Sequence, residues 1–389
     1  MKLFKTLAAT AAIAVAALAG APAHAADPVK IGLILPMSGP FASTGKQIDA
    51  AVKLYIKTHG DTVAGRKIEV ILKDDTGTAP DVTKRLAQEL IVNDKVDILA
   101  GFGLTPLAFA AAPLSEEAKK PMIVMAAATS AITTKSPYIL RTSFTLPQVT
   151  AGIADWAGKN KIKKVYILVT DYGPGIDAEN QFKKTFAAAG GEVVGSARIP
   201  LKNPDYGPFM QRAKDAAPHA VFAFVPSGEG TGFMKEFAER GLAKAGIKLI
   251  ATGDVLDDDI LDAMGDTALG VISSHHYSAA HKSKENLQYV ADFQKANPGM
   301  RPNFMSLGGW DGMDLIYQVL KKTNGDASGD KFVAAAKGMS WLSPRGQISI
   351  DADTRDITQT VYIRKVEKVD GHLYNVEFDQ LKDVKDPGK

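Results

Sequence analysis

The chain has 389 residues, which is long for a single hydrophobic core, so two lobes are expected. Hydrophobic residues make up 46% and charged residues 23% of the sequence, as in soluble globular proteins, and the net charge of +3 does not indicate a nucleic-acid binder. The absence of cysteine excludes disulfides and a lipid anchor on cysteine.

Residues 1–25 have the pattern of a cleaved signal peptide. Lys2 and Lys5 give a basic start, an alanine-rich apolar stretch follows, and "APAHA" ends in a small-x-small cleavage pattern after Ala25. The apolar stretch is short and weakly hydrophobic for a membrane span, although an uncleaved anchor is the alternative. We therefore predict export of the chain from residue 26 onward.

Strand and helix alternate through the first half of the chain. Ile48, Ala51, Val52 and Tyr55 fall on one face of a helix, and the apolar runs between such helices have the length of buried strands. Short connections between alternating elements predict a parallel sheet with helices on both faces. Strands are expected at 29–35, 67–75, 96–102 and 121–129, with helices at 45–60, 80–94 and 105–120.

The alternation restarts after residue 149 and predicts a second lobe of the same kind. The last part differs, because 310–325 and 330–338 have helical patterns while 346–371 alternates like antiparallel strands. Asp257, Asp258 and Asp259 precede a short pattern at 258–264 and are expected to cap a helix there. Strands are expected at 163–171, 192–200, 220–227 and 247–254, with helices at 152–161, 178–191, 206–218 and 230–246.

The loops after the strands contain no recognisable catalytic motif. There is no G-x-S-x-G, Walker A or H-E-x-x-H sequence, and the G-x-G fragments at 101–106 and 173–179 lack a third glycine. His275, His276 and His281 lie close in sequence but lack acidic or cysteine partners at metal-site spacing. We therefore expect a binding protein rather than an enzyme, with no metal and no cofactor.

The sequence resembles the leucine/isoleucine/valine-binding type of periplasmic substrate-binding protein of ABC importers. The resemblance begins with "VKIGLILPMSGPFASTGKQIDAAVKL" and continues through "KDDTGTAPDVTKRLAQELI", "AGFGLTPLAFAAAPL", "PMIVMAAATS", "YILRTSF" and "DYGPGIDAENQF". It implies an α/β protein of two doubly wound, Rossmann-like lobes joined by a three-segment hinge. It places lobe 1 at 27–145 plus 278–357 and lobe 2 at 146–277 plus 358–389.

The stretch "MAAATSAITTK" follows an expected strand with small residues and hydroxyls. In the family that the sequence resembles, the matching loops hold the ligand carboxylate, which implies this role for Thr105, Ala127, Ala128 and Thr129. The chemistry fits, because a desolvated carboxylate needs several donors, and backbone N–H groups at helix N-termini provide them. Alanine lets the ligand reach the backbone, and threonine adds a hydroxyl.

The resemblance also implies a lid and walls. Tyr172 matches an aromatic residue that covers the ligand, and Ser43 and Thr44 match a position that walls the pocket. Ser227 lies near a position where the family has a tyrosine. Because Ser43, Thr44 and Ser227 are small, they leave more room than the side chains of leucine binders do.

Three further residues are implied near the ligand. Asp254 aligns near the acid that holds the ammonium of amino-acid ligands, and it could instead accept a hydrogen bond from a ring hydroxyl. Tyr277 is placed near a hinge crossing, where it could touch the ligand. Phe102 could face the cleft, and packing in the core is the alternative.

We favour an aromatic carboxylate of the benzoate, hydroxybenzoate, phenylpropenoate or arylpyruvate type as the ligand. A flat ring fits between a tyrosine face and a small-residue wall. Branched-chain amino-acid binding and a ligand-sensing subunit of a membrane receptor are the alternatives. The resemblance implies a monomer in the periplasm of a Gram-negative bacterium that closes by a hinge and is recognised by ABC permease subunits.

Overall fold

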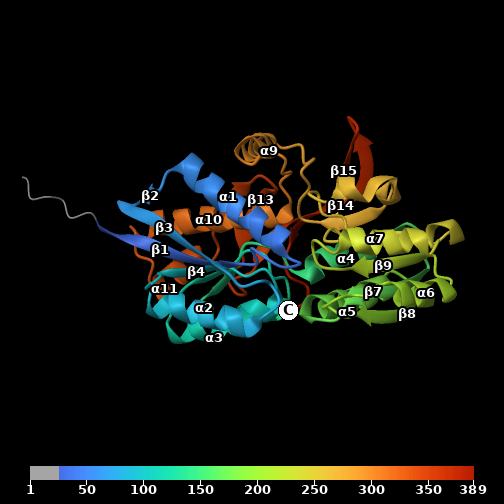
Figure 1. Ribbon diagram of the computed structural model, residues 1–389, viewed down its shortest axis with the longest axis horizontal. Coiled ribbons are helices and arrows are strands. Elements are labelled where there is room, and N and C mark those ends of the chain that lie inside the picture. The colour runs from blue at the N-terminus through green and yellow to red at the C-terminus, as the bar shows by residue number, and fades with distance from the viewer. Residues whose placement is uncertain (1–25) are drawn as a thin grey trace, which may run out of the picture.

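The computed structural model describes residues 26–389, and the predicted signal peptide lies outside the described residues. Two bodies of strands and helices lie side by side along the long axis (Figure 1). One contains a six-stranded sheet and the other a nine-stranded sheet, and we call them lobe 1 and lobe 2. Because the lobe 1 sheet is mostly parallel and the lobe 2 sheet contains a block of five parallel strands, with helices covering both, the predicted α/β fold of two doubly wound lobes is confirmed.

Strand β1 lies in the interior of the lobe 1 sheet, whose strand order is β2-β3-β1-β4-β5-β6. Neighbouring residues of β1 point to opposite faces, so Leu33 packs with Ile48 of α1, while Ile34 shares a cluster with Leu86 and Leu90 of α2. Both faces are therefore buried under helices. The strands are β1 (Ala26–Leu35), β2 (Thr62–Val63), β3 (Arg66–Asp74), β4 (Ile98–Gly101), β5 (Met122–Val124) and β6 (Ile139–Arg141), and the helices are α1 (Ala42–His59), α2 (Pro80–Val92), α3 (Thr105–Glu117), α9 (Lys284–Ala296), α10 (Phe304–Lys322), α11 (Gly329–Ala336) and the 3-10 turn η1 (Ser130–Thr134).

The lobe 2 sheet has the order β12-β13-β14-β11-β10-β9-β7-β8, and β15 pairs with β14 beside this path. Strands β7 to β11 pair in parallel, whereas β13, β14 and β15 pair antiparallel, as the alternation in the last part predicts. The strands are β7 (Lys164–Thr170), β8 (Glu192–Ile199), β9 (Ala220–Phe224), β10 (Lys248–Thr252), β11 (Ile272–His275), β12 (Ser340–Ser343), β13 (Gly346–Ile350), β14 (Ile357–Val369) and β15 (His372–Val384), and the helices are α4 (Leu146–Lys159), α5 (Gly173–Ala188), α6 (Gly207–Asp215), α7 (Gly230–Glu239), α8 (Leu261–Met264) and the 3-10 turns η2 (Ala243–Ala245) and η3 (Gly265–Ala268).

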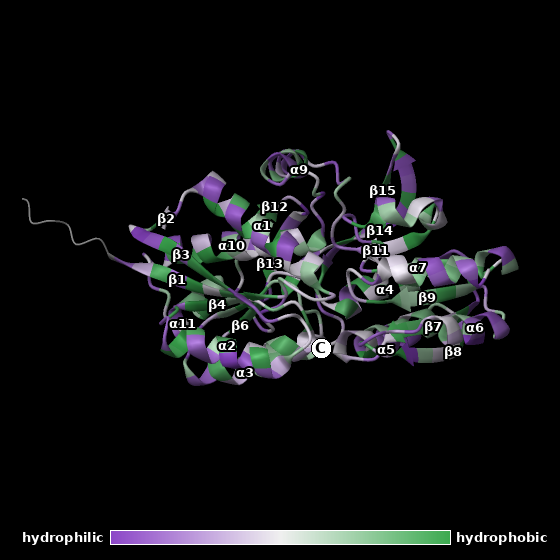
Figure 2. Ribbon diagram, in the orientation of Figure 1, coloured by the Kyte–Doolittle hydropathy of each residue, from purple (hydrophilic) through white to green (hydrophobic). Residues whose placement is uncertain are grey.

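Hydrophobic residues concentrate along the central strands of both lobes, while the outer helices carry hydrophilic stripes (Figure 2). Every residue of β9 is buried, as expected for a strand with helices on both sides. None of the helices within residues 26–389 is long and apolar enough to pass through a membrane.

The chain passes between the lobes three times. By the sheet in which each strand pairs, it does so between β6 and α4, between β11 and α9, and between α11 and β12. The divisions expected after residues 145, 277 and 357 stay predictions, and the third differs from the sheet pairing, because β12 and β13 join β14 in the lobe 2 sheet. Residues 385–389 return toward lobe 1, since the carboxylate of Asp386 accepts hydrogen bonds from Ser130 and Thr145.

Two local expectations are wrong. The strand expected over 121–129 ends at Val124, and the following small residues leave the sheet as a loop. The helix expected at 258–264 covers only Leu261–Met264, and the three aspartates before it accept hydrogen bonds from distant segments. Asp257 accepts from Asn303, Asp258 from the N–H of Ala279 and Asp259 from Ser43, so tertiary contacts take the side chains that were expected to cap the helix.

Candidate functional site

A small pocket lies between the two lobes, where strands of both sheets end. In open α/β sheets, ligands bind beyond the carboxyl ends of the strands, so the location agrees with the general rule. The lining residues are Thr44, Gly103, Leu104, Thr105, Ala126, Ala127, Ala128, Phe144, Leu146, Tyr172, Pro174, Phe224, Pro226, Ser227, Asp254 and Met305.

The lobe 1 wall is the small-residue loop that follows β5. The N–H of Ala127 donates to the carbonyl of Phe102 at 3.0 Å, whereas the N–H groups of Ala128 and Thr129 have no hydrogen-bond partner within residues 26–389. The hydroxyl of Thr105 donates to that of Thr129 at 3.1 Å. This wall therefore offers two unpartnered backbone N–H groups to a bound group, and the Thr105 hydroxyl would donate to it only by turning its hydrogen away from Thr129.

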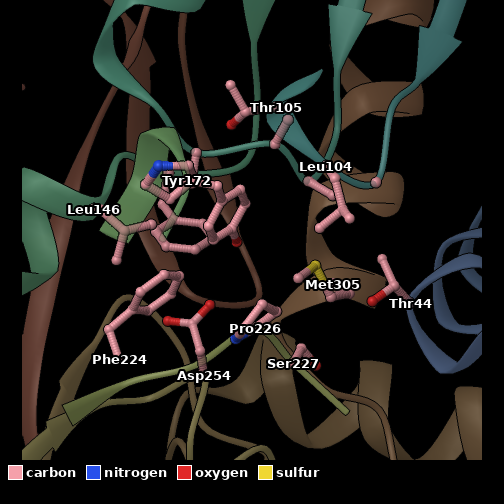
Figure 3. Close-up of a pocket in the computed structure, with 16 residues that line it drawn as sticks. Thr44, Leu104, Thr105, Leu146, Tyr172, Phe224, Pro226, Ser227, Asp254 and Met305 are labelled. Carbon is pink, nitrogen blue, oxygen red and sulfur yellow. The ribbon is translucent and has the colours of Figure 1, made fainter. Parts of the chain in front are cut away.

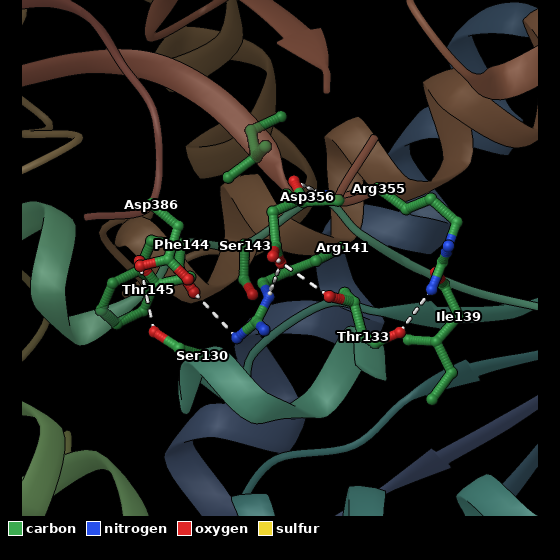
Figure 4. Close-up of polar contacts among 12 residues, drawn as sticks. Ser130, Thr133, Ile139, Arg141, Ser143, Phe144, Thr145, Arg355, Asp356 and Asp386 are labelled. Atoms are coloured by element: carbon green, nitrogen blue, oxygen red, sulfur yellow. Dashed lines mark hydrogen bonds and ion pairs between the residues drawn. The ribbon is translucent and has the colours of Figure 1, made fainter. Parts of the chain in front are cut away.

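Arg141 holds this loop from behind. Its guanidinium donates to the carbonyl oxygens of Ala127 and Thr129 at 3.0 and 2.8 Å. In a trans peptide the following N–H points the opposite way from the carbonyl, so the N–H of Ala128 is directed away from Arg141. Arg141 is itself anchored by Asp356 at 2.7 Å, and both side chains are buried (Figure 4). No local pattern indicates this role, because Asp356 lies 215 residues away in the chain.

Helix N-termini meet at the pocket. Helix α3 begins at Thr105 and α5 begins at Gly173, directly after Tyr172. A Cβ atom on Gly173 would lie 2.5 Å from the hydroxyl oxygen of Thr129, so only glycine allows α5 to approach the lobe 1 loop this closely. The N-terminal ends of helices carry partial positive charge, which favours an anion here.

Aromatic and aliphatic side chains form the middle of the pocket. The rings of Tyr172 and Phe224 are nearly parallel, with centroids 6.0 Å apart, and Phe144, Leu146 and Met305 complete the apolar lining. Burial, followed by the nearby charge of Asp254, raises the pKa of Tyr172 well above its ordinary value, so this residue stays a neutral phenol. The middle of the pocket is suited to a flat apolar body.

Asp254 supplies the charge of the lobe 2 wall. It follows β10, it is buried, and its Oδ2 atom has no hydrogen-bond partner in the described structure. Figure 3 shows its carboxylate between Phe224 and Pro226, on the opposite side of the Tyr172 ring from Thr105. Nε2 of His275 lies 3.5 Å from Oδ2 of Asp254. Burial lowers the pKa of His275 to about 4, although Asp254 acts in the opposite direction, so the imidazole is neutral at neutral pH.

The structure brings most of the predicted ligand-binding residues onto one surface. No arginine or lysine lines the pocket, so an anionic ligand would rely on N–H and hydroxyl donors. The predicted residues on the lining are Thr44, Thr105, Ala127, Ala128, Tyr172, Ser227 and Asp254.

Four predicted residues lie off the lining. Thr129 stands behind the wall and accepts from Thr105, and Ser43 donates to Asp259 at the junction of the lobes. Phe102 is fully buried in the core between the lobe 1 sheet and α2 and α3, which is the packing alternative.

Tyr277 is also fully buried, and its hydroxyl donates to Asn286 at 2.9 Å.

Several lining residues were not predicted from the sequence. Phe224 is the last residue of β9 and Pro226 follows it, so their place at the carboxyl end of a strand was the available signal. Met305 lies at the start of α10, in the segment of lobe 1 that follows the second crossing, and no local sequence pattern indicates that it lines the pocket.

The other histidines and acidic residues of the described chain lie apart from the pocket lining. Within residues 26–389 there is no group of three or more histidine or acidic side chains placed to hold an ion. His276 lies beside His275, with ring centroids 4.4 Å apart, and His281 instead contacts Glu377 at 2.7 Å.

Comparisons with known proteins agree with this fold. A family model described as periplasmic binding protein matches residues 28–371, and the chain belongs to this family. The Leu/Ile/Val-binding protein homolog 6 of Brucella abortus (strain 2308) is 47% identical over 381 residues, which is 97% of each chain. The resemblance inferred from the sequence is therefore confirmed.

Two solved structures are similar throughout. A solute-binding protein of an ABC transporter from Rhodopseudomonas palustris BisB5, in complex with 3,4-dihydroxybenzoic acid, is 63% identical with a TM-score of 0.91. Another from Rhodopseudomonas palustris HaA2, in complex with p-hydroxybenzoic acid, is 47% identical with a TM-score of 0.90. Each alignment covers 93% of this chain and 99% of the other.

Proposed function

We propose that this protein is the periplasmic solute-binding component of an ABC importer and that its ligand is a ring-hydroxylated aromatic acid of the hydroxybenzoate type. The observation that carries the proposal is the polarity of the pocket. Unpartnered N–H groups and the Thr105 hydroxyl lie on one side, the unpartnered carboxylate oxygen of Asp254 lies on the other, and aromatic side chains lie between them.

This arrangement sets the direction of the ligand. Asp254 would repel a ligand carboxylate, so the carboxylate belongs at Ala128 and Thr105, beside the N-termini of α3 and α5. The ring then lies against Tyr172 and Phe224. A hydroxyl at the far end of the ring would donate to Asp254, whose oxygen would otherwise be buried without a partner.

The two solved relatives support this ligand class, because one holds 3,4-dihydroxybenzoic acid and the other p-hydroxybenzoic acid. Both of those ligands have a carboxylate and a hydroxyl at opposite ends of one ring. The ligand-binding residues named from the sequence remain part of this proposal, with Ser43, Phe102, Thr129 and Tyr277 acting from behind the wall.

A branched-chain amino acid is the second candidate. Asp254 could hold an ammonium group, and the Brucella relative is described as a Leu/Ile/Val-binding protein homolog. The aromatic lining of the pocket and the hydroxybenzoate ligands of the two similar solved structures favour the ring acid over this candidate.

The proposed mechanism is hinge closure. The carboxylate binds lobe 1 first, and lobe 2 (146–277 plus 358–389) then turns on lobe 1 (27–145 plus 278–357), bringing Tyr172 over the ring. The ligand favours closure only by its preference for the closed form. Membrane permease subunits would recognise that form, and the protein would bind its solute without transforming it.

Thermal unfolding with a ligand panel tests the function. The chain lacking residues 1–25 is denatured and refolded to remove co-purified ligand, and benzoate, 4-hydroxybenzoate, a cinnamate, leucine and valine are then added separately. A ligand present at about 100 times its Kd adds about 2.7 kcal/mol of stability, which shifts the midpoint by several degrees. A shift with ring acids alone supports the proposal, and a shift with leucine or valine alone overturns it in favour of amino-acid binding.

A further inference from the structure

A second polar group lies beside Asp254 on the lobe 2 wall. Ser227 follows β9 as Asp254 follows β10, and these strands are parallel neighbours with Ala223 paired to Ala251. Adjacent strands are about 4.8 Å apart, so the two loops leave the sheet side by side. The pocket therefore has two hydrogen-bonding side chains on its lobe 2 side, with Pro226 between them (Figure 3).

Ser227 is held in a fixed orientation. Its hydroxyl donates to Oδ2 of Asp257, and the same oxygen accepts from the amide of Asn303 at 2.9 Å. All three side chains are buried. A serine hydroxyl has one hydrogen to donate, and here Asp257 takes it. The lone pairs of the Ser227 oxygen are left to accept a hydrogen bond from a ligand in the pocket.

Residues of both lobes hold Ser227 in place. Asn303 caps α10 of lobe 1 by accepting from the N–H groups of Met305 and Ser306, while its amide donates to Asp257 of lobe 2. Met305 lines the same pocket. Ser227 is thus fixed by Asp257 at a place where the two lobes meet.

We propose that Ser227 is a second hydroxyl-binding position and that the pocket selects aromatic acids with two adjacent ring hydroxyls, such as 3,4-dihydroxybenzoate. The inference rests on the proposed function. The 4-hydroxyl donates to Asp254 and the 3-hydroxyl donates to the Ser227 oxygen, while Asp257 and Asn303 position Ser227. A ligand without the 3-hydroxyl still binds, because the hydrogen bond from Ser227 to Asp257 is retained.

The test is calorimetric titration of wild-type protein and Ser227→Ala with benzoate, 4-hydroxybenzoate and 3,4-dihydroxybenzoate. One neutral hydrogen bond corresponds to roughly three- to tenfold in Kd. Wild type is expected to bind 3,4-dihydroxybenzoate tighter than 4-hydroxybenzoate by that factor. Ser227→Ala is expected to bind the two equally.

Ser43→Ala serves as the matched serine control, because Ser43 contacts Asp259 outside the pocket lining and its loss should leave the ratio of the two Kd values unchanged. Equal Kd values in wild type, or a ratio that survives in Ser227→Ala, would overturn the hydroxyl position while leaving the proposed function intact. Failure of every aromatic acid to bind wild type would overturn the proposed function itself.

Discussion

Oδ2 of Asp254 lies 3.5 Å from Nε2 of His275, and neither atom has a hydrogen-bond partner within residues 26–389. Burial keeps His275 neutral, because it lowers the pKa of the imidazole to about 4. The neighbouring ring therefore does not neutralise the carboxylate. Oδ2 of Asp254 therefore remains able to accept a hydrogen bond from a ligand in the pocket.

Replacement of Asp254 by alanine should separate ligands by what they carry at the far end. A hydrogen bond to a charged group contributes about 1.5–3 kcal/mol, so Asp254→Ala should weaken 4-hydroxybenzoate roughly 10- to 100-fold. Benzoate, which lacks the hydroxyl, should bind unchanged or tighter. Calorimetric titration of both ligands measures the difference, and equal effects on both would place Asp254 away from the ring hydroxyl.

Thr105 acts at the other end, and its loss should affect every carboxylate ligand alike. Its hydroxyl lies on the lining and contacts Thr129. On binding, its hydrogen would turn from Thr129 to the ligand carboxylate, and loss of such a hydrogen bond costs about 1 kcal/mol, so Thr105→Ala should raise the Kd of benzoate and 4-hydroxybenzoate by the same factor of about five. Thr105→Ser, which keeps the hydroxyl, is the control. A factor that depends on the ring substituent would contradict this placement.

The contributions of these residues differ in how visible they are in the sequence. Tyr172, Ala128 and Asp254 were named through the family resemblance, and their positions in the structure agree with the rule that ligands bind at the carboxyl ends of parallel strands. Arg141 holds the same loop, yet its role depends on Asp356, which is 215 residues away. No local pattern reports such a contact, because the fold alone brings the two side chains together.

The same limit applies to the aspartates before α8. A run of acidic residues before a helical pattern indicates capping, which is a local interaction. In the structure Asp259 instead accepts from Ser43, 216 residues away, and Asp257 accepts from Asn303. Contacts between the lobes took precedence over the local preference for capping. Such contacts join residues far apart in the chain, so no local sequence pattern predicts them.

His275 should make stability depend on pH. An unfolded histidine has a pKa near 6.5, while burial lowers that of His275 to about 4, so the unfolded state takes up a proton first as pH falls. The contribution is fully present above pH 6.5 and is lost between about pH 6.5 and pH 4. Its size is on the order of 3 kcal/mol.

Urea unfolding of wild type and His275→Phe across this range measures the effect. Phe fits the surroundings, since Phe304 and Phe144 already lie against the imidazole. The difference between the two proteins should shrink or reverse as pH falls from 6.5 to 4. Burial raises the pKa of Asp257, which acts in the opposite direction, but both proteins share it. A constant difference would mean that His275 does not titrate as proposed.

The buried ion pair behind the lobe 1 loop should be far more important for stability than the terminal lysine that joins it. Asp356 contacts both Arg141 and Lys389, and its carboxylate lies next to Thr133 (Figure 4). Asp356→Asn leaves the buried Arg141 charge unpaired, which costs about 3–5 kcal/mol of unfolding free energy. Lys389→Met leaves the inner pair intact and should cost about 1 kcal/mol or less.

Binding adds a second readout to this comparison. Because Arg141 orients the carbonyls of Ala127 and Thr129, Asp356→Asn should also weaken benzoate, whereas Lys389→Met should not. Urea unfolding and calorimetric titration of both variants give the four values required. Similar losses in the two variants would show that the loop does not depend on the inner pair.

Ser43 gives a test of closure that is separate from ligand contact. Its hydroxyl donates to Asp259 across the junction of the lobes, and it does not line the pocket. Ser43→Ala removes a hydrogen bond that forms only when the lobes meet, so a smaller fraction of the protein is closed. The apparent Kd rises in inverse proportion to that closed fraction. About 1 kcal/mol predicts a rise of roughly fivefold, identical for benzoate, 4-hydroxybenzoate and 3,4-dihydroxybenzoate. Calorimetric titration measures the factor, and small-angle X-ray scattering of ligand-free protein should show a larger radius of gyration. A factor that varies with the ring hydroxyls would instead place Ser43 against the ligand, as the sequence resemblance implied.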